Sequence, residues 1–258
     1  MTKRVTLITG ASSGIGAELA RIFASNGANT VLVARREDRL RQLADEIAAA
    51  GHPRPEILAC DLCAPDICDT ITASLKAMDV EVETVVNNAG YGLFGEAIDL
   101  DRTQQLAMVD LNVRVLTDLT LRFADGIVRH RGGILNVASI ASFLPGPRMA
   151  VYYATKAYVL SFTEAMRGEL GPKGVRVTAL CPGTVPTEFQ GVAGFKPGLD
   201  SAVLNLSAAA VARAGYRGLM SNKRLVLPGV GVRMIPFLLR FAPRSLVLAS
   251  VARVQQKR

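Results

Sequence analysis

The chain has 258 residues, of which 50% are apolar and 20% are charged, with a mean hydropathy of +0.27. This much apolar material supports a large buried core and excludes an intrinsically disordered protein. The sequence lacks a run of about 18 apolar residues, so we expect no membrane-spanning helix. A strand-like run follows Met1–Arg4 directly. That start leaves no room for a signal peptide, and we expect a cytoplasmic protein.

The formal net charge of +8 is unevenly distributed along the chain. Residues 201–258 contain ten Lys and Arg and no Asp or Glu, whereas residues 1–200 contain 20 basic and 22 acidic residues. Proteins that bind nucleic acid usually spread their basic residues over the working face. We therefore expect no nucleic-acid partner, and the basic C-terminal segment needs a separate explanation.

Four cysteines suit a reducing compartment as free thiols. The spacing of Cys60, Cys63 and Cys68 resembles part of a metal site, but zinc takes four ligands and Cys181 is far away in the chain. We expect no bound metal. The chain has only two histidines and no nucleophile elbow, which disfavours a Ser-His-Asp hydrolase.

Short β-branched runs alternate with longer helical patterns through the first 180 residues. Most of these runs are continuously apolar, as strands buried on both faces are. We expect strands at Val5–Thr9, Thr30–Ala34, Ile57–Cys60, Thr84–Asn87, Gly133–Ala138, Val175–Leu180 and Arg224–Leu227. We expect helices over Gly16–Asn26, Arg36–Ala50 and Val151–Leu170. This order predicts an α/β fold, a single doubly wound Rossmann-type domain over residues 1–258 with a parallel sheet between two helical layers.

A glycine-rich turn joins the first strand to the first helix. The segment Thr9–Gly16 reads T-G-A-S-S-G-I-G, and its members Gly10, Ser12, Ser13, Gly14, Ile15 and Gly16 are candidate cofactor-binding residues. Glycines let the backbone approach a pyrophosphate, and the helix N-terminus presents free N–H groups to it. A purely structural turn is the alternative.

The second predicted strand ends in Val33-Ala34-Arg35-Arg36, where an acidic residue would favour NAD. Arg35 instead offers a guanidinium to a ribose 2′-phosphate. We therefore expect NADP(H), with NADPH favoured over NADH. Two solvated arginines at a strand end are the alternative.

Polar residues follow the third and fourth predicted strands at the edge where parallel sheets bind ligands. These candidates are Asp61 and Leu62 in one segment and Asn88, Ala89 and Gly90 in the other. Asp61 has two interpretations: it binds the adenine amino group, or it is a helix N-cap.

Tyr152 and Lys156 lie four residues apart in a predicted helix, so both face the same site. A tyrosine with a pKa near ~10 is a poor acid–base catalyst at neutral pH, and a nearby ammonium lowers that pKa. Tyr153 has Ala157 at the same spacing, which cannot act in this way. Ser139, at the end of the fifth predicted strand, is placed to bind a substrate oxygen. Asn112, in a helical stretch, is placed to hold a water that relays protons to Lys156.

These motifs resemble the short-chain dehydrogenase/reductase family over residues 3–190. Thr9–Gly16 is similar to its cofactor turn, Asn87–Gly90 to its N-N-A-G motif, and Asn112, Ser139, Tyr152 and Lys156 to its catalytic tetrad. Pro182, Gly183, Val185 and Thr187 fall in a segment similar to the one that seats the nicotinamide. The resemblance implies a seven-stranded sheet in the order 3-2-1-4-5-6-7. It also implies hydride transfer between NAD(P)H and a carbonyl or alcohol, and a homodimer or homotetramer.

The resemblance assigns Tyr152 as the general acid of reduction, with Tyr152 and Lys156 also contacting the cofactor. Oxidation of a secondary alcohol or a hydroxysteroid is the alternative direction, and a non-catalytic dinucleotide sensor is a third hypothesis. Apolar residues near the site favour a lipophilic ketone or 3-oxoacyl substrate. They are Tyr91, Phe94, Phe143, Leu144, Met149, Val185, Phe189 and Phe195.

Two further segments carry predictions. Residues 184–200 contain three glycines and are expected to form a substrate lid. Residues 222–258 mix apolar residues with eight Lys and Arg, and we expect Pro236 and Pro243 to divide them into short pieces. This C-terminal extension either packs on the domain, covers the substrate cleft, forms a subunit contact or makes a peripheral membrane contact. It is similar to the tail of a subgroup of bacterial reductases, some of which are assigned long-chain 3-oxoacyl substrates.

Overall fold

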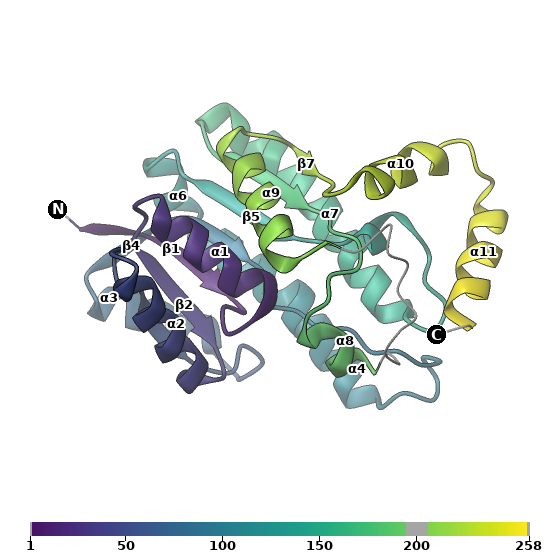
Figure 1. Cartoon of the computed structure of the whole chain (residues 1–258), viewed down its shortest axis with the longest axis horizontal. Helices are drawn as coiled ribbons and strands as arrows, with labels where there is room; N and C mark the ends of the chain where they lie inside the picture. The colour runs from purple at the N-terminus through teal and green to yellow at the C-terminus, as the bar shows by residue number, and fades with distance from the viewer. Residues whose placement is uncertain (1, 195–205, 257–258) are drawn as a thin grey trace.

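A computed structural model describes residues 2–194 and 206–256 of the chain (Figure 1). Within these residues, seven strands form one parallel sheet in the order β3-β2-β1-β4-β5-β6-β7, which confirms the predicted fold class and strand order. The strands are β1 (Lys3–Thr9), β2 (Thr30–Ala34), β3 (Glu56–Ala59), β4 (Val80–Asn87), β5 (Gly133–Val137), β6 (Arg176–Leu180) and β7 (Leu225–Val226).

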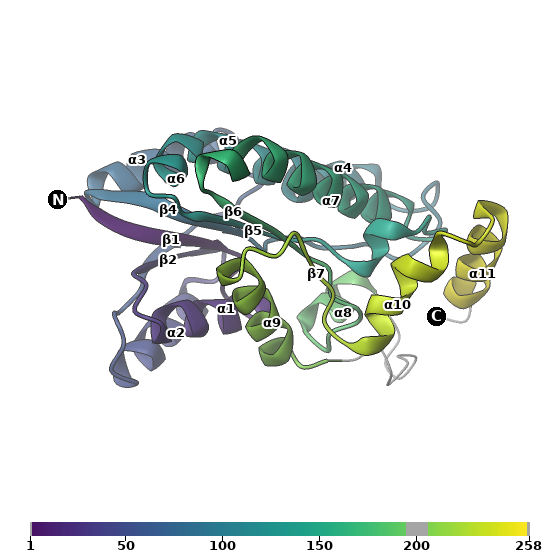
Figure 2. The same ribbon diagram turned by 90° about the horizontal axis from the view of Figure 1, so that it is seen from above.

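Helices cover both faces of this sheet, as Figure 2 shows edge-on. On one face lie α1 (Gly14–Ser25), α2 (Glu37–Ala49) and α9 (Ala208–Met220). On the other lie α3 (Ile67–Ala77), α4 (Arg102–Val109), α5 (Leu116–Arg122), α6 (Ala124–Arg129) and α7 (Ala150–Leu170). The connections contain α8 (Glu188–Ala193), the π-helical segment η1 (Asp110–Val115), and the 3-10 segments η2 (Ile140–Phe143) and η3 (Gly171–Lys173).

The core consists of two apolar layers, one on each side of the sheet. Leu19 of α1, Leu40 of α2 and Val211 of α9 belong to one layer, and Ile71 of α3 and Leu119 of α5 belong to the other. Every residue of β2 and β5 is buried, which explains why these strands read as continuous apolar runs. The carboxyl ends of the strands are thereby fixed at one edge of the sheet, where the predicted site lies.

The predicted strands and helices match the observed ones closely, and the largest difference is the start of β4. Residues 80–82 pair in parallel with residues 3–5, so β4 begins at Val80 instead of at Thr84. Glu81 and Glu83 alternate with apolar residues in this stretch and are only half-buried. This end of the strand therefore lacks the continuous apolar pattern on which the prediction rested.

The C-terminal extension runs from β7 into α10 (Val230–Leu239) and α11 (Arg244–Gln256), which project beyond the carboxyl end of the sheet (Figures 1 and 2). The prediction that Pro236 divides this segment is wrong, because Pro236 lies inside α10. Its neighbours Ile235 and Phe237 are not turn formers, so the helix continues despite one lost hydrogen bond. Pro243, by contrast, directly precedes α11. Among the described residues, no helix is both long and apolar enough to cross a membrane.

Candidate active site

A cavity of about 730 Å³ lies at the carboxyl ends of the strands. It is lined by residues that follow β1 to β6, which are far apart in sequence. Every residue predicted for catalysis or cofactor binding lines this cavity except Gly16 and Asn112. These two lie directly behind the lining, against Gly10 and Tyr91. The fold thus brings the whole predicted set together.

The glycine-rich turn requires two of its glycines for separate physical reasons. Gly10 has φ +65°, and an added Cβ would lie 2.8 Å from Asn88 Nδ2. At Gly16 an added Cβ would lie 2.3 Å from the carbonyl oxygen of Gly10. A side chain at either position would displace the backbone, and the N-terminus of α1 follows at once with its free N–H groups.

Residues after β4 hold this turn in place. Asn88 Nδ2 donates to the carbonyl oxygens of Thr9 (2.9 Å) and Gly10 (3.1 Å). The Thr9 hydroxyl accepts from the backbone N–H groups of Asn88 (3.0 Å) and Ala89 (3.1 Å). These bonds fix the Asn88–Gly90 segment against the glycine turn, so both present backbone to the same part of the cavity.

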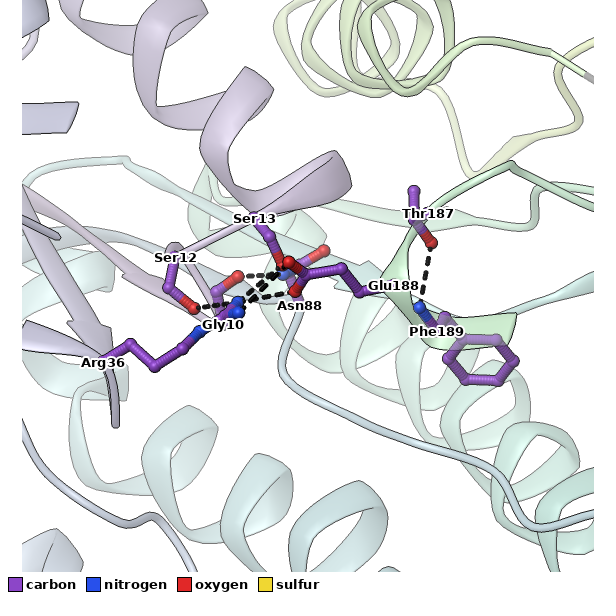
Figure 3. A network of polar contacts seen from close by, with 8 residues as sticks. All are labelled: Gly10, Ser12, Ser13, Arg36, Asn88, Thr187, Glu188 and Phe189. Atoms are coloured by element: carbon purple, nitrogen blue, oxygen red, sulfur yellow. Dashed lines mark hydrogen bonds and ion pairs between the residues drawn. The ribbon is translucent and has the colours of Figure 1, made fainter. Parts of the chain in front are cut away.

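Arg36 makes the main polar network at this end of the cavity (Figure 3). Its guanidinium donates to both carboxylate oxygens of Glu188, at 2.7 and 3.1 Å, and to the hydroxyls of Ser12 and Ser13, each at 3.1 Å. The hydrogen bond from Arg36 lowers the pKa of Glu188, and the same bond raises the pKa of Arg36. The network joins the end of β2, the glycine turn and α8.

Arg36 and Glu188 are not among the predicted site residues, although both line the cavity with Arg35. Arg36 could have been found from the sequence, because it follows Arg35 in the motif that predicts NADP(H). Glu188 carries no comparable signal, because its partner is 152 residues away. Only the position after Thr187, which caps α8, marks it as a residue in the first turn of a helix.

Asp61 does not cap a helix, so that interpretation is wrong. The next helix, α3, begins at Ile67 and has Asp66 at its N-cap position. The Asp61 carboxylate instead accepts from the backbone N–H of Cys63 at 2.9 Å, closing a tight turn after β3. Its side chain remains exposed at the cavity, and Leu62 beside it is buried.

Tyr152 and Lys156 are both buried, one turn apart at the start of α7. Lys156 Nζ donates to the carbonyl oxygen of Val137 at 2.8 Å and lies 5.9 Å from the centre of the Tyr152 ring. Burial raises the pKa of Tyr152, and a hydrogen bond with Ser139 opposes that rise. Burial lowers the pKa of Lys156 to about 8. The two shifts oppose charge on either group in this conformation.

Ser139 follows β5 and is also buried. Its side-chain oxygen accepts from the backbone N–H of Ala141 at 3.1 Å, as the N-cap of η2. This bond fixes the serine oxygen at the cavity surface beside Tyr152. This bond uses a lone pair of the oxygen, so the hydroxyl proton is available to Tyr152, with which Ser139 hydrogen-bonds, or to a substrate oxygen.

Asn112 lies in η1, a π-helical segment within the long helical stretch. Such wide turns are rare and are often found at functional sites. Its Nδ2 donates to Tyr91 O (3.0 Å) and Thr155 Oγ1 (3.1 Å), and its Oδ1 accepts from Tyr91 N (3.2 Å). An added Cβ on Gly90 would lie 2.8 Å from Asn112 Oδ1 and 3.5 Å from Lys156 Nζ. Asn112 and Lys156 therefore share the space beside Gly90.

The segment after β6 closes the cavity from the other side. Pro182 O accepts from the N–H of Ile140 at 2.9 Å, which holds the segment next to Ser139. An added Cβ on Gly14 would lie 3.1 Å from Thr187 Cγ2, so the segment also reaches the glycine turn. Pro182, Gly183 and Val185 lie between these two points and line the cavity.

Apolar residues surround Tyr152. Tyr91, Phe94, Met149 and Phe189 belong to its apolar cluster, and the rings of Tyr152 and Phe189 are 5.4 Å apart. Phe143 packs elsewhere, against the cluster that contains Leu116 and Val159, so it is not part of this wall. Leu144 does not line the cavity either. Phe195 and the predicted lid residues 195–200 lie outside the described residues.

All four cysteines are free thiols. Cys60 and Cys63 are half-buried, and desolvation raises the pKa of both. Cys63 Sγ is 3.8 Å from the carbonyl oxygen of Ala107. In the part of the chain that the structure describes, no three His, Cys, Asp or Glu side chains are grouped as metal ligands.

This fold and site define a dinucleotide-binding oxidoreductase. The sequence model of short chain dehydrogenases matches residues 4–194. The chain is 36% identical to a sulfoacetaldehyde reductase of Chromohalobacter salexigens over 188 residues, which cover 72% of this chain and 74% of that protein. It is 37% identical to an 11-beta-hydroxysteroid dehydrogenase of Arabidopsis thaliana, covering 72% of this chain and 53% of that protein.

Comparison with solved structures supports the same family. A short-chain dehydrogenase of Sphingobium yanoikuyae in complex with NADPH has a TM-score of 0.82 and 31% identity, covering 95% of this chain and 94% of that one. The bulky-bulky ketone specific alcohol dehydrogenase of Comamonas testosteroni has a TM-score of 0.78 and 28% identity, with the same coverage. The chain therefore belongs to the short-chain dehydrogenase family. It is an NAD(P)-dependent oxidoreductase that acts on alcohol and carbonyl groups of small molecules.

Proposed function

We propose that this protein is an NADPH-dependent reductase that transfers a hydride to the carbonyl of a lipophilic ketone or 3-oxoacyl substrate. The observation that carries the proposal is the arrangement of the cavity. Tyr152, Lys156 and Ser139 meet at an apolar end of it, and Arg35 and Arg36 lie at the other end.

The residues at the glycine turn fit a dinucleotide. Gly10 and Gly16 leave a cradle that a Cβ would fill, and the N-terminus of α1 adds N–H donors for phosphate. When bound, the cofactor supplies the hydride. The backbone and side chains that would hold it are Gly10, Ser12, Ser13, Gly14, Ile15, Arg35, Asp61, Leu62, Asn88, Ala89, Gly90, Tyr152, Lys156, Pro182, Gly183, Val185 and Thr187. Gly16 supports them from behind.

Tyr152 acts as the general acid and donates its phenolic proton to the substrate carbonyl oxygen. Burial raises the pKa of Tyr152, so the phenol holds this proton at neutral pH until the reaction needs it. The Lys156 ammonium lowers that pKa when it turns from Val137 O towards Tyr152. In the present conformation the ammonium is held by Val137, so this role requires a rotation of the side chain.

Ser139 binds the same carbonyl oxygen and orients it. The N-cap bond from Ala141 leaves the serine proton free for that purpose. Asn112 holds the backbone around Gly90 and Tyr91 and keeps a proton-relay water near Lys156. The relay restores the proton that Tyr152 gives up.

The two arginines support the preference for NADPH. Arg35 and Arg36 both follow β2 and line the cavity, where a guanidinium pairs with a 2′-phosphate in two hydrogen bonds. The structural relative from Sphingobium yanoikuyae was solved with NADPH. Arg35 makes the main contact in this proposal, and Arg36 adds a second charge.

A fluorescence titration with NADPH and with NADH tests the cofactor. We expect tighter binding of NADPH, and a loss of about 10- to 100-fold in NADPH affinity in Arg35→Ala, since a charge-assisted hydrogen bond contributes roughly 1.5–3 kcal/mol. NADH affinity should change little. Arg41→Ala is the matched control, because its guanidinium pairs with Glu37 on the exposed surface of α2. Equal or tighter binding of NADH would contradict the assignment.

The apolar wall around Tyr152 supports a lipophilic substrate. A structural relative is named for its specificity for bulky-bulky ketones. A panel of ketones and 3-oxoacyl thioesters of increasing chain length tests this, with NADPH oxidation as the readout. We expect KM to fall as apolar length grows, and a preference for small polar carbonyls would contradict it.

Oxidation of a secondary alcohol or hydroxysteroid is the second candidate, and the similarity to an 11-beta-hydroxysteroid dehydrogenase favours it. The same site serves both directions. Rates measured both ways on a matched ketone and alcohol, at cellular cofactor ratios, decide between them. A preparation that binds cofactor tightly but converts no member of either panel would instead indicate a dinucleotide sensor.

We propose a cytosolic homodimer or homotetramer, supported by the free cysteines and by the exposed apolar residues of α10, α11 and their junction. These residues are Val230, Met234, Phe237, Leu238, Phe241, Leu246, Leu248 and Val254. Light scattering after gel filtration should give the mass of two or four chains, reduced in Phe237→Ser/Phe241→Ser. An anionic membrane is the second candidate for this surface, since residues 201–258 carry no acidic group. A monomer that floats with anionic vesicles at low salt would support the membrane.

A further inference from the structure

The last turn of α11 reaches back to the substrate end of the cavity. Gln255 is only 1% exposed, although Val254 and Gln256 on either side of it are exposed. In Figure 1 this end of α11 returns towards the body of the molecule, whereas α10 and the start of α11 project from it. Gln255 is therefore fully enclosed in a helix whose other residues are exposed or only half-buried.

Gln255 is held by two residues from the segment around the start of α7. Its Nε2 donates to the hydroxyl of Tyr153 at 3.0 Å. Its backbone carbonyl oxygen accepts from Arg148 Nη1 at 3.3 Å. Breaking either bond leaves a further buried polar group unsatisfied, in addition to Gln255 Oε1 and Arg148 Nε, which have no hydrogen-bond partner among the described residues.

Arg148 connects this anchor to the apolar cluster around Tyr152, to which Phe94 belongs. Its guanidinium lies 4.6 Å from the centre of the Phe94 ring, and its carbonyl oxygen accepts from the N–H of Gly95 at 2.8 Å. The backbone of Arg148 has φ +65°, a conformation that residues other than glycine rarely adopt. Contacts on several sides hold it in that conformation.

Tyr153 is the point where the anchor meets the site. Its ring lines the cavity and lies edge-on to the ring of Tyr152, with centres 6.1 Å apart. The ring also packs on Gly146, where an added Cβ would lie 2.2 Å from Cγ of Tyr153. The ring is thus confined by Gly146 and Tyr152, and its hydroxyl is held by Gln255.

We propose that Gln255 is a positioning residue that sets the substrate specificity of this enzyme. It fixes Tyr153, which lines the cavity, and Arg148, which packs on Phe94 of the apolar cluster around Tyr152. The inference rests on the proposed carbonyl reduction. It assigns a function to Tyr153, which has Ala157 four residues later, and to the C-terminal helix, which lies beyond the matched family region of residues 4–194. Tyr152 keeps its chemistry when the wall loosens, but small ketones lose contacts and bulky ones gain room.

The test is a double-mutant cycle on selectivity. Gln255→Met keeps the volume of the side chain and removes the hydrogen bond, and Tyr153→Phe removes it from the other side. In each variant the ratio of kcat/KM for a bulky ketone to that for a small one should rise about two- to tenfold, the equivalent of one hydrogen bond. The change should come mainly from KM. In the double variant, the ratio of kcat/KM values should change by the same factor as in either single variant, and not by the product of the two factors.

Gln256→Met, one residue further along α11 and exposed, is the matched control and should leave the ratio unchanged. The affinity for NADPH should stay within twofold in every variant, since the cofactor end of the cavity is remote from Gln255. A proportional loss on all ketones, or effects that multiply in the double variant, would overturn the proposal.

Hydrogen exchange provides a readout that does not depend on turnover. In Gln255→Met, amides of residues 244–256 and 146–153 should exchange faster than in the native protein, and in Gln256→Met they should not. Unchanged exchange in Gln255→Met would overturn the anchor itself. If hydrogen exchange confirms the anchor but no carbonyl is reduced, the proposed reaction is wrong. The contact between α11 and Tyr153 then still holds.

Discussion

The guanidinium of Arg36 and the carboxylate of Glu188 form a two-pronged ion pair at the glycine-rich end of the cavity, at 2.7 and 3.1 Å (Figure 3). Arg36 comes from the end of β2 and Glu188 from the first turn of α8. The same guanidinium contacts Ser12 and Ser13. Glu188 is thus paired with Arg36 at the place where a cofactor phosphate is expected to bind. The Glu188 carboxylate and the phosphate therefore compete for the Arg36 guanidinium.

Removal of the carboxylate charge should therefore tighten cofactor binding. Both side chains are about half exposed, and exposed ion pairs contribute about 0–1 kcal/mol. We expect Glu188→Gln to lower the Kd for NADPH up to about fivefold, and that for NADH less, because NADPH carries one more phosphate. Fluorescence titration at low and moderate salt measures both. Weaker binding of NADPH in this variant would mean that Glu188 holds α8 over the cofactor instead of competing with it.

Replacement of the proposed general acid should separate binding from chemistry. We expect Tyr152→Phe to reduce kcat at least about 1,000-fold, since proton transfer by a positioned side chain contributes roughly 10²–10⁴-fold. The affinity for NADPH should remain within a few-fold, because the ring that packs on Phe189 is retained. Tyr158→Phe is the control: this hydroxyl bonds Thr117 on the helix surface and should not affect turnover. A near-normal rate in Tyr152→Phe would refute the assigned role.

The lowered pKa of Lys156 predicts a pH dependence at the cofactor-binding step. Burial brings this pKa from 10.5 to about 8 in the cofactor-free protein, so the ammonium loses its proton as the pH rises through about 8. The ammonium is the form proposed to hold the cofactor and assist Tyr152. The value of kcat/KM for NADPH reports the cofactor-free enzyme, so it should be constant below pH 8 and fall about tenfold per unit above it.

Lys156→Arg tests this assignment, because a guanidinium keeps its proton throughout the range. We expect that variant to be less active but flat between pH 7 and pH 10. A decline at the same pH in both proteins would show that another group controls it. Circular dichroism across the range confirms that the fold is intact in each.

The sheet and most of the site could be predicted because their signals are local. Each strand carries its own apolar run, and the order of strands and helices determines a doubly wound sheet. Tyr152 and Lys156 are one helical turn apart, and Gly10 to Gly16 form one turn. Such local patterns can be recognised in the sequence without knowledge of contacts between distant residues.

The missed features depend on contacts between distant residues. Arg36 pairs with Glu188 across 152 positions, and Gln255 bonds Tyr153 across 102. Neither pair has a spacing that a sequence pattern records. The wide helical turn at Asn112 is a further case, because one extra residue per turn leaves the helical propensity of the segment unchanged.

Two glycines should respond oppositely to replacement by alanine. Gly132 precedes β5, and an added Cβ would lie 1.7 Å from the carbonyl oxygen of Glu83 in the adjacent strand. Backbone cannot yield as a flexible side chain does, so Gly132→Ala must displace β4 from β5. Overpacking of this kind costs about 1–3 kcal/mol or more, and we expect Tm to fall by roughly 5–10 °C.

Gly168 lies in the last turns of α7, where nothing comes within 4 Å of an added Cβ. Alanine there restricts the unfolded chain and suits the helix, which is worth about 0.5–1 kcal/mol. We expect Gly168→Ala to raise Tm by roughly 1–4 °C with unchanged turnover. Differential scanning calorimetry of both variants beside the native protein measures the two shifts. Two shifts of the same sign would contradict the packing described for β4 and β5, because only that packing separates the two positions.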